Sequence, residues 1–443
     1  MQLFGYLFLF LLCAMSVFST RWMLAFSMVF FALEVALEGS VELFRSNLTL
    51  ANYIVGIITL IALTKSLTIK ENPLKAYFNP VFYMILAIFI WSIVSLIWSP
   101  ALPIQDNTGS NIIKGTWPQF ILTVLLTPLL VWDLDDWNAA LPKFLLLGSI
   151  TCLMIFLNPE FTIKNGRIGI DLGGGLRTSP LAIGQVGGII AVISALYIPP
   201  KRSFWILILQ ISSFLLGSLL AFRSGSRGQI LFSGIIIIAF YPMARKIKNF
   251  KSFFGAVFGF IIISILALLA FQYVSGESEV NRWSDQGIES GTGIRFFFII
   301  KLLSAFAYSP VAWIIGLGFN AFSSLGEGLY GQGYSHSAFV DVLAELGIPA
   351  FVILLTALAI SVQSGVVLFR RFSESQTHRA AVASLIAMLA YQILLSNKEG
   401  NLWSSVNLFL FMLLLVRIEI LTRDHEIETL DQIDEEDLRE SKY

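Results

Sequence analysis

A single histidine, His336, is the clearest candidate for acid–base chemistry in this 443-residue chain, which has only three histidines. Its flanking serines can cap a short helix that begins at His336 and is ended by Gly347 with Pro349. A histidine in the first helical turn faces the positive end of the helix dipole, which favours neutral imidazole. Neutral imidazole can accept a proton from a hydroxyl group. The plainer alternative is a hydrogen-bonded histidine at a membrane interface.

Two arginines in the segment 222–228 offer a second kind of chemistry, the binding of an anion. Arg223 and Arg227 are four residues apart in a turn between apolar segments, so they share one face if the turn continues either helix. Guanidinium groups bind phosphate through paired hydrogen bonds and keep their charge when partly desolvated. A lipid diphosphate is an anion that fits such a site. The alternative is ordinary anchoring of interfacial arginines to lipid head groups.

The composition is that of an integral membrane protein. The chain is 56% hydrophobic and 13% charged, whereas soluble domains carry about 25% charged residues. Its formal net charge of zero is not that of a generally basic nucleic-acid binder, so no nucleic-acid partner is expected. Cys13 and Cys152 both lie in apolar segments, which favours two buried thiols over a disulfide or a metal pair.

Thirteen apolar segments approach the length of ~20 residues that a membrane-spanning helix needs. The expected fold is therefore an all-α polytopic membrane protein with about 12–13 transmembrane helices. The first segment lacks a preceding positive charge, so we interpret it as a span rather than as a cleaved signal peptide. The segments are residues 3–18, 22–38, 51–69, 78–98, 118–132, 141–157, 181–199, 203–221, 229–244, 252–273, 348–370, 379–396 and 400–418.

The lysines and arginines of the short loops predict the orientation of the chain. Four loops carry clusters of these residues, and alternating crossings put all four on one side of the membrane. Cytoplasmic loops are enriched in Lys and Arg, so this side is the expected cytoplasm, and the carboxy terminus lies there too. The four loops lie near residues 65–75, 201–202, 245–251 and 370–379, and the opposite side receives residues 99–117, 158–180, 222–228, 274–347 and 397–399.

The long loop 274–347 carries most of the candidate chemistry. Residues 294–308 are expected to form a helix that lies along the membrane interface, with Arg295 reaching out of it. Asp341 and Glu345 follow four residues apart, and their simplest interpretation is a polar helix face toward water.

The chain is expected to form a transmembrane catalytic domain, residues 1–421, followed by an acidic cytoplasmic tail, residues 422–443. A solvated extension is the ordinary interpretation of such a tail, and a docking site for a partner is the alternative. No metal or other cofactor is expected, because no group of His, Cys, Asp and Glu has the spacing of metal ligands. The outer loops also lack an Asp-x-Asp pair that would hold a divalent cation beside a diphosphate.

Three motifs within roughly residues 170–350 resemble those of the O-antigen ligase/polymerase superfamily of bacterial envelopes. The first places Gly347 nine residues after His336-Ser337, as in the family's histidine signature, with a departure at Ala350. The second is a Ser-Arg-Gly turn at the end of a span. The third is a Gly-x-Arg sequence that leads into an apolar helix and then a Gly-x-Gly sequence. The second motif is Ser226-Arg227-Gly228, and the third is Gly293-Ile294-Arg295 followed by Gly316-Leu317-Gly318. The chain departs from the family at Ser179-Pro180-Leu181, where the family usually has an asparagine.

The resemblance implies a GT-C-type, metal-independent glycosyltransferase in the bacterial inner membrane. Its donor would be an undecaprenyl-diphosphate-linked glycan, bound at the periplasmic face among membrane lipids. His336 would activate the acceptor hydroxyl, and direct attack at the anomeric carbon would invert its configuration. The cations would stabilise the charge of the departing diphosphate. The residues implied for the diphosphate are Arg223, Arg227 and Arg295, and the candidates for other substrate contacts are Arg177, Asn320 and Tyr334.

Two transfer reactions and one different class of function remain open. A ligase passes the glycan to lipid A–core, and a polymerase passes it to another lipid-linked repeat unit; the histidine signature favours the ligase. A transporter or flippase needs charged residues along a path through its spans. Here the charges within the spans are few, chiefly Glu34 and Glu38 in the second span, which favours chemistry at one face.

Overall fold

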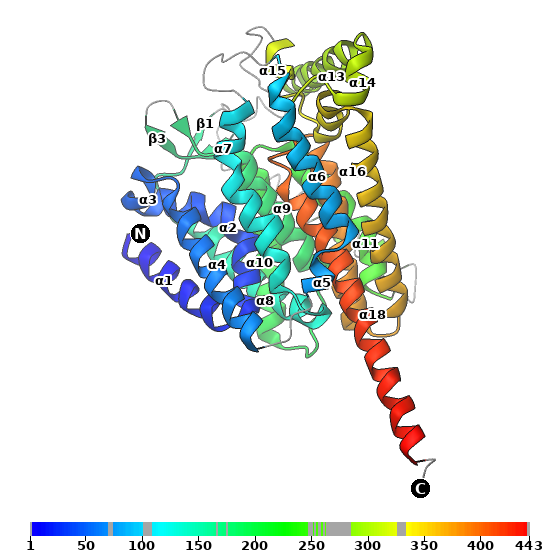
Figure 1. Cartoon of the computed structure of the whole chain (residues 1–443). Helices are drawn as coiled ribbons and strands as arrows, with labels where there is room; N and C mark the ends of the chain where they lie inside the picture. The colour runs from blue at the N-terminus through cyan, green and yellow to red at the C-terminus, as the bar shows by residue number, and fades with distance from the viewer. Residues whose placement is uncertain are drawn as a thin grey trace.

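The computed structural model describes residues 2–69, 74–100, 109–164, 167–173, 176–246, 285–325 and 334–440, with residues 251, 254, 255, 258, 259 and 262. Long helices stand side by side in one bundle, and short elements cover one end of it (Figure 1). The expected segment 252–273 lies largely outside the described residues.

In the described part of the chain, nine helices are long and apolar enough to cross a membrane, which confirms an all-α polytopic membrane protein. Two shorter apolar helices, α1 (Gln2–Phe18) and α9 (Pro180–Leu196), pack among them. The nine are α2 (Thr20–Ser40), α4 (Leu50–Ile69), α6 (Pro80–Val94) with η1 (Ser95–Ile97), α7 (Gly109–Phe120) with η2 (Ile121–Leu126) and η3 (Thr127–Leu130), α8 (Leu134–Leu157), α10 (Phe204–Arg223), α11 (Arg227–Ala244), α16 (Ala338–Arg371) and α17 (Gln376–Ser396).

Two spans begin earlier than the sequence predicts. The expected span 118–132 is the end of a longer one that starts at Gly109, because polar residues are tolerated where a helix leaves the apolar layer. The expected span 141–157 starts instead at Leu134, since Asp133 accepts a hydrogen bond from the backbone N–H of Asp136 and so caps α8.

The last helix, α18 (Val406–Glu440), projects from one end of the bundle, which we call the lower face (Figure 1). It begins at Val406 rather than near residue 400, and it continues through the acidic segment as a helix. The short helix α5 (Leu74–Tyr77) also lies at the lower face.

Polar contacts identify which connections share the lower face. Arg21 Nε bonds to Asp136 Oδ1 at 2.7 Å, and His378 Nε2 lies 2.9 Å from Asp135 Oδ1. The basic residues near 245 and 370–379 lie on this face as well, where Lys246 approaches Glu374 at 3.8 Å. Two of the four predicted basic loops, near residues 245 and 370–379, therefore lie together on this face.

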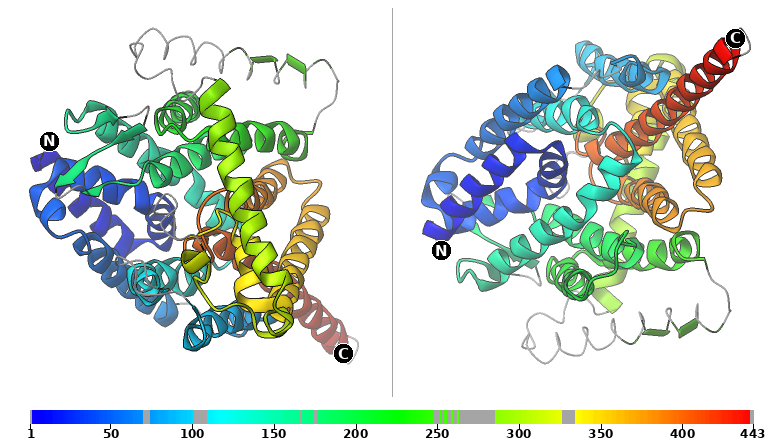
Figure 2. Two further views of the ribbon diagram at one scale, coloured as in Figure 1. Left: turned by 90° about the horizontal axis from the view of Figure 1, so that it is seen from above. Right: turned by 90° about the horizontal axis from the view of Figure 1, so that it is seen from below.

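The opposite end, the upper face, carries the short elements. Seen from above, helix α13 (Asp285–Ala307) lies across the ends of the bundle helices (Figure 2). This agrees with the helix expected along the interface, although it begins earlier than residue 294. Two small antiparallel hairpins, which the sequence analysis did not predict, join α8 to α9. The remaining elements of this face are α3 (Glu42–Ser46), α14 (Pro310–Ile315), α15 (Phe322–Leu325), and strands β1 (Thr162–Lys164), β2 (Arg167–Gly169), β3 (Asp171–Gly173) and β4 (Leu176–Arg177).

Helix α16 crosses from the upper to the lower face with one interruption near its start. Gly347 has φ of +88°, a conformation that favours glycine, and the helix bends there. The Ser337 hydroxyl caps the helix by accepting the backbone N–H of Val340. The helix thus begins at Ala338, so the expectation that His336 lies in its first turn is wrong.

The tightest helix contact in the centre of the bundle depends on two glycines. Gly187 of α9 faces Gly217 of α10, and a Cβ added at Gly187 would lie 2.7 Å from the Gly217 carbonyl oxygen. It would also lie 2.7 Å from the backbone nitrogen of Ala221. Small residues let the backbones of membrane helices approach closely, so this pair sets the distance between α9 and α10.

We predict that Gly187→Ala lowers the free energy of unfolding by about 1–3 kcal/mol, because the added methyl group must push two backbones apart. Thermal unfolding of the purified protein in detergent measures the change. Gly56→Ala in α4 is the matched control, since a Cβ there meets nothing within 4 Å. Equal stability of the two variants would contradict the packing described for α9 and α10.

Candidate active site

The turn between α10 and α11 places its two arginines at the ends of different helices. Arg223 is the last residue of α10 and Arg227 is the first residue of α11. Between them Gly225 has φ of +67°, and the chain reverses direction. The turn therefore continues neither helix, and the condition under which both guanidinium groups would share a helix face is not met. Both side chains are half-buried at the upper face.

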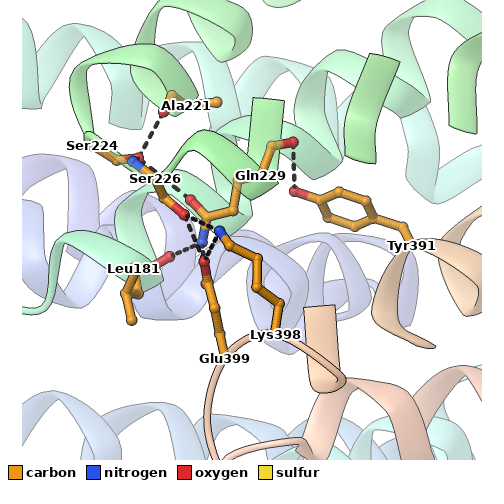
Figure 3. A network of polar contacts seen from close by, with 8 residues as sticks. All are labelled: Leu181, Ala221, Ser224, Ser226, Gln229, Tyr391, Lys398 and Glu399. Carbon is orange, nitrogen blue, oxygen red and sulfur yellow. Dashed lines mark hydrogen bonds and ion pairs between the residues drawn. The ribbon is translucent and has the colours of Figure 1, made fainter. Parts of the chain in front are cut away.

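A carboxylate from the connection between α17 and α18 holds the start of α11 (Figure 3). Glu399 Oε1 accepts hydrogen bonds from Ser226 Oγ and Lys398 Nζ, each at 2.6 Å. Its other oxygen, Oε2, accepts from Gln229 Nε2 at 3.0 Å. Ser226 is the N-cap residue of α11, yet its hydroxyl donates to Glu399 and makes no capping bond. Glu399 thus joins two parts of the chain that are more than 160 residues apart.

The glycine of the Ser-Arg-Gly turn makes room for Lys398. A Cβ at Gly228 would collide with the Nζ, Cδ and Cε atoms of that lysine. Lys398 Nζ also lies 3.4 Å from Ser226 Oγ and 6.0 Å from the centroid of the Phe232 ring. The turn and the connection 397–399 therefore form one packed unit, with the ammonium group beside Arg227's helix.

His336 lies between two aromatic rings just before α16. The Phe298 ring of α13 is stacked on the imidazole with centroids 6.2 Å apart, and the Tyr334 ring meets it edge-on at 4.6 Å. His336 has φ of +71°, which is strained for a residue with a side chain. The next residue, Ser337, has its Oγ 3.3 Å from Asn397 Oδ1, so the histidine segment contacts the connection that carries Lys398.

Buried polar groups fix the strained histidine segment. Ser335 Oγ donates a short hydrogen bond of 2.5 Å to Asp341 Oδ1 and accepts the N–H of Ser337 at 3.2 Å. Asp341 is 3% exposed, as is Glu345. The expectation that both carboxylates face water is wrong, because the upper-face elements cover this side of α16.

Glu345 holds the turn that follows α14. Its two oxygens accept the backbone N–H groups of Asn320 at 2.9 Å and Phe322 at 3.1 Å. Asn320, a candidate substrate contact, is buried, and its amide Nδ2 donates to Ser323 Oγ at 3.1 Å. Its φ of +63° fits the tight turn. The amide of Asn320 is thus used within its own turn.

Electrostatic effects show that residues from separate motifs lie near one another. The pKa of His336 is lowered to about 4, chiefly by burial and also by the positive charges of Arg295 and Lys398, while Glu399 acts in the opposite direction. Burial also lowers the pKa of Lys398, against the effect of Glu399, and Arg295 and Arg227 add to the lowering. The imidazole is therefore neutral because it is buried beside cations, and the helix-dipole explanation is replaced.

One further cation reaches the site from the hairpins. Burial raises the pKa of Tyr334, Glu399 and Asp341 raise it further, and Arg295 and Arg167 oppose them. Arg167 begins strand β2, so the first hairpin borders the histidine segment. Arg177 ends strand β4, and its side chain lies outside the described residues.

Sequence reasoning assigned no role to Lys398, Glu399 or Arg167. A signal was available for the first two, since a Lys-Glu pair stands in a short connection on the side with few basic loops. Among the residues that the structure describes, no group of three or more His, Cys, Asp or Glu lies where it could hold a metal ion.

We predict that His336 titrates well below its ordinary pKa of 6.5, near 4, and that Lys398→Gln raises the midpoint because a positive neighbour is removed. Glu399→Gln should lower it. NMR of histidine-labelled protein measures the midpoints, and His336→Gln identifies the signal among three histidines.

Between pH 6.5 and 4 the unfolded chain binds a proton here that the folded chain does not, so His336 reduces stability as the pH falls through this window. A midpoint near 6.5 would contradict the buried, cation-flanked environment.

Comparison with known proteins finds a family match for part of the chain. Residues 211–355 match the family model described as O-antigen ligase. The matched segment runs from α10 to the first half of α16 and includes Arg227, Arg295 and His336. A search of curated proteins found no match. The match of this segment supports a relationship of the chain to the O-antigen ligase/polymerase superfamily.

Proposed function

We propose that the chain is a membrane glycosyltransferase that moves a glycan from undecaprenyl diphosphate to an acceptor hydroxyl. The upper face, with the site, would meet the periplasm, and the lower face with the tail 422–443 would meet the cytoplasm of a bacterial inner membrane. The observation that carries the proposal is the grouping of His336 with three cations, Arg227, Arg295 and Lys398, at one face. These residues come from different elements, so a common purpose at one site accounts for their convergence.

His336 is proposed as the general base. The imidazole is neutral and can accept the proton of an acceptor hydroxyl as its oxygen attacks the anomeric carbon. The new carbon–oxygen bond forms as the bond to the diphosphate oxygen breaks, and the diphosphate leaves with the electron pair. Attack from the side opposite the leaving group inverts the anomeric configuration.

Arg227, Arg295 and Lys398 are proposed to bind the diphosphate. Fixed cations in a partly buried site stabilise negative charge that grows as the leaving group departs. Arg227 is also the first residue of α11, whose N-cap hydroxyl bonds to Glu399 and not to the helix backbone. The positive end of that helix dipole therefore adds to the attraction for phosphate. Glu399 is proposed as a positioning residue that holds this arrangement. Arg223 remains a candidate for diphosphate binding, and Arg177 and Tyr334 remain candidate substrate contacts.

Donor binding should also activate the base. Arg295 and Lys398 lower the basicity of His336 in the empty site. A bound diphosphate would neutralise these charges and so raise the affinity of the imidazole for a proton. Proton transfer from the acceptor hydroxyl to His336 is then more favourable when the donor is in place.

Lipid A–core is the favoured acceptor, which makes the protein a ligase, and the alternative is a polymerase that joins lipid-linked repeat units. A transporter or flippase fits less well. Among the described helices, Glu34 of α2 accepts a hydrogen bond from Asn52 at 2.5 Å, and Arg417 of α18 donates one to the Val131 carbonyl at 3.0 Å. These buried charges bond to separate neighbours and do not form a series across the bundle.

We predict that His336→Gln and Arg227→Gln each lower the rate of glycan transfer by about 10²-fold or more, because they remove a base and a charge that stabilises the transition state. Purified variants in liposomes with a polyprenyl-diphosphate glycan give the rates. His378→Gln and Arg202→Gln, which lie on the lower face, are matched controls and should keep normal rates. Undiminished transfer by the His336 variant would refute its assignment as base.

A chelator should leave the rate unchanged, and strong inhibition would overturn the metal-independent mechanism.

The acceptor is identified by competition in the same liposomes. When lipid A–core and a second lipid-linked repeat unit are both present, we expect the glycan on lipid A–core. Mass spectrometry of the products distinguishes the two outcomes. Chains of repeat units on the polyprenyl carrier would instead identify a polymerase.

A further inference from the structure

The lower face contains a cavity that the proposed transfer reaction does not use. Its volume is about 270 Å³, and it lies where the turn from α1 to α2, the end of α4 and the start of α8 meet. The helix ends that form this cavity lie at the opposite end of the bundle from the upper-face elements that carry the candidate active site (Figure 1). The cavity is lined by Val17, Phe18, Ser19, Thr20, Arg21, Ala62, Lys65, Ser66, Trp132 and Asp136.

Two cations in the lining are available to an anion. Arg21 bonds to Asp136 through Nε, and 45% of its side chain is exposed, so the guanidinium group is held in place and accessible. Lys65 is exposed, and its Nζ lies 4.9 Å from the centroid of the Phe18 ring, which keeps the ammonium group beside the end of α1. Hydroxyl groups from Ser19, Thr20 and Ser66 add hydrogen-bond donors.

The nearby carboxylates are already engaged. Asp136 is 3% exposed and accepts from Arg21, and Asp133 accepts the backbone N–H of Asp136 at 2.6 Å. Asp135 pairs with His378 at 2.9 Å. An incoming anion therefore meets the ammonium group of Lys65 and the remaining guanidinium N–H groups of Arg21, whose charge Asp136 offsets. The start of α2 directs the positive end of its dipole toward the same place.

The surroundings of the cavity indicate the source of the anion. The outward faces of α1 and α4 are apolar and exposed, and Phe18 at the cavity is 76% exposed. Acyl chains that cover these faces would place a head group at the ends of the two helices, next to the cavity. The exposed residues include Leu3, Phe4, Leu7, Phe10 and Leu11 of α1, and Tyr53, Ile57, Leu60 and Ile61 of α4.

We infer that this cavity binds the phosphate ester of a membrane phospholipid, with Arg21 and Lys65 contacting the phosphate. The two cations and the hydroxyl groups suit the phosphate of such a lipid. The adjoining apolar faces of α1 and α4 suit its acyl chains. The inference is independent of the transfer reaction proposed for the upper face.

Binding of dihexanoyl phosphatidylglycerol to the purified protein, measured by calorimetry below its micelle concentration, tests the inference. Lys65→Gln should weaken binding about fivefold, the effect expected for one basic residue at a lipid head group. Lys65 is exposed and makes no ion pair among the described residues, so the variant should fold. Lys201→Gln, which removes an exposed lysine between α9 and α10, is the matched control and should leave affinity unchanged.

Three outcomes would overturn the inference. The first is an absence of saturable binding, and the second is equal weakening by Lys65→Gln and Lys201→Gln, which would indicate only general attraction to basic residues. The third comes from a parallel arm with inorganic phosphate. If free phosphate binds as tightly as the lipid with the same dependence on Lys65, the cavity is a phosphate site and the lipid assignment fails.

Discussion

The carboxylate of Glu399 is the contact on which the rest of the candidate site depends. It accepts from Ser226, Gln229 and Lys398, and so fixes the start of α11 against the connection between α17 and α18. A buried carboxylate with its oxygens satisfied holds its partners in one geometry. Without Glu399, the ammonium group of Lys398 would be half-buried beside two arginines with no carboxylate to pair with. The unpaired charge would destabilise the folded state, so the lysine side chain would move toward solvent.

The histidine side of the site is fixed by a second, separate set of buried groups. Asp341 holds Ser335, and Glu345 holds the turn that contains Asn320 and Phe322. Indole groups complete the frame, since Trp91 Nε1 donates to the Leu346 carbonyl at 3.1 Å and Trp98 Nε1 to the Gly316 carbonyl at 3.3 Å. These bonds keep irregular backbone satisfied at the edge of the bundle, which a membrane protein requires. His336 can then remain in a strained conformation between two rings.

The fold and the motif residues could be predicted from local signals in the sequence. Apolar segments predicted most spans, and the short motifs singled out His336, Arg227 and Arg295. The contacts among them could not be predicted, because Ser226 and Glu399 lie 173 residues apart and nothing local pairs them. The burial of Asp341 and Glu345 was missed for the same reason. A four-residue spacing describes a helix face but not what covers it, and here α14 and the turn after it do so.

The source of the neutral imidazole shows how local and tertiary causes can be confused. A helix start near His336 suggested the dipole as the cause, yet the helix starts two residues later and burial dominates. Similarly, Arg223 and Arg227 have helical spacing, but Gly225 breaks the helix between them. In both cases the backbone decided how the side chain is presented, which the residue type and spacing alone did not predict.

The most direct test of the central claim is the structure of the protein in a lipid nanodisc with undecaprenyl diphosphate bound, determined by electron cryo-microscopy. We expect density for the diphosphate within hydrogen-bond distance of Arg227, Arg295 and Lys398, at the start of α11 and on the side of the site that faces His336. Diphosphate bound elsewhere, with His336 and these cations making no contact to it, would contradict the account.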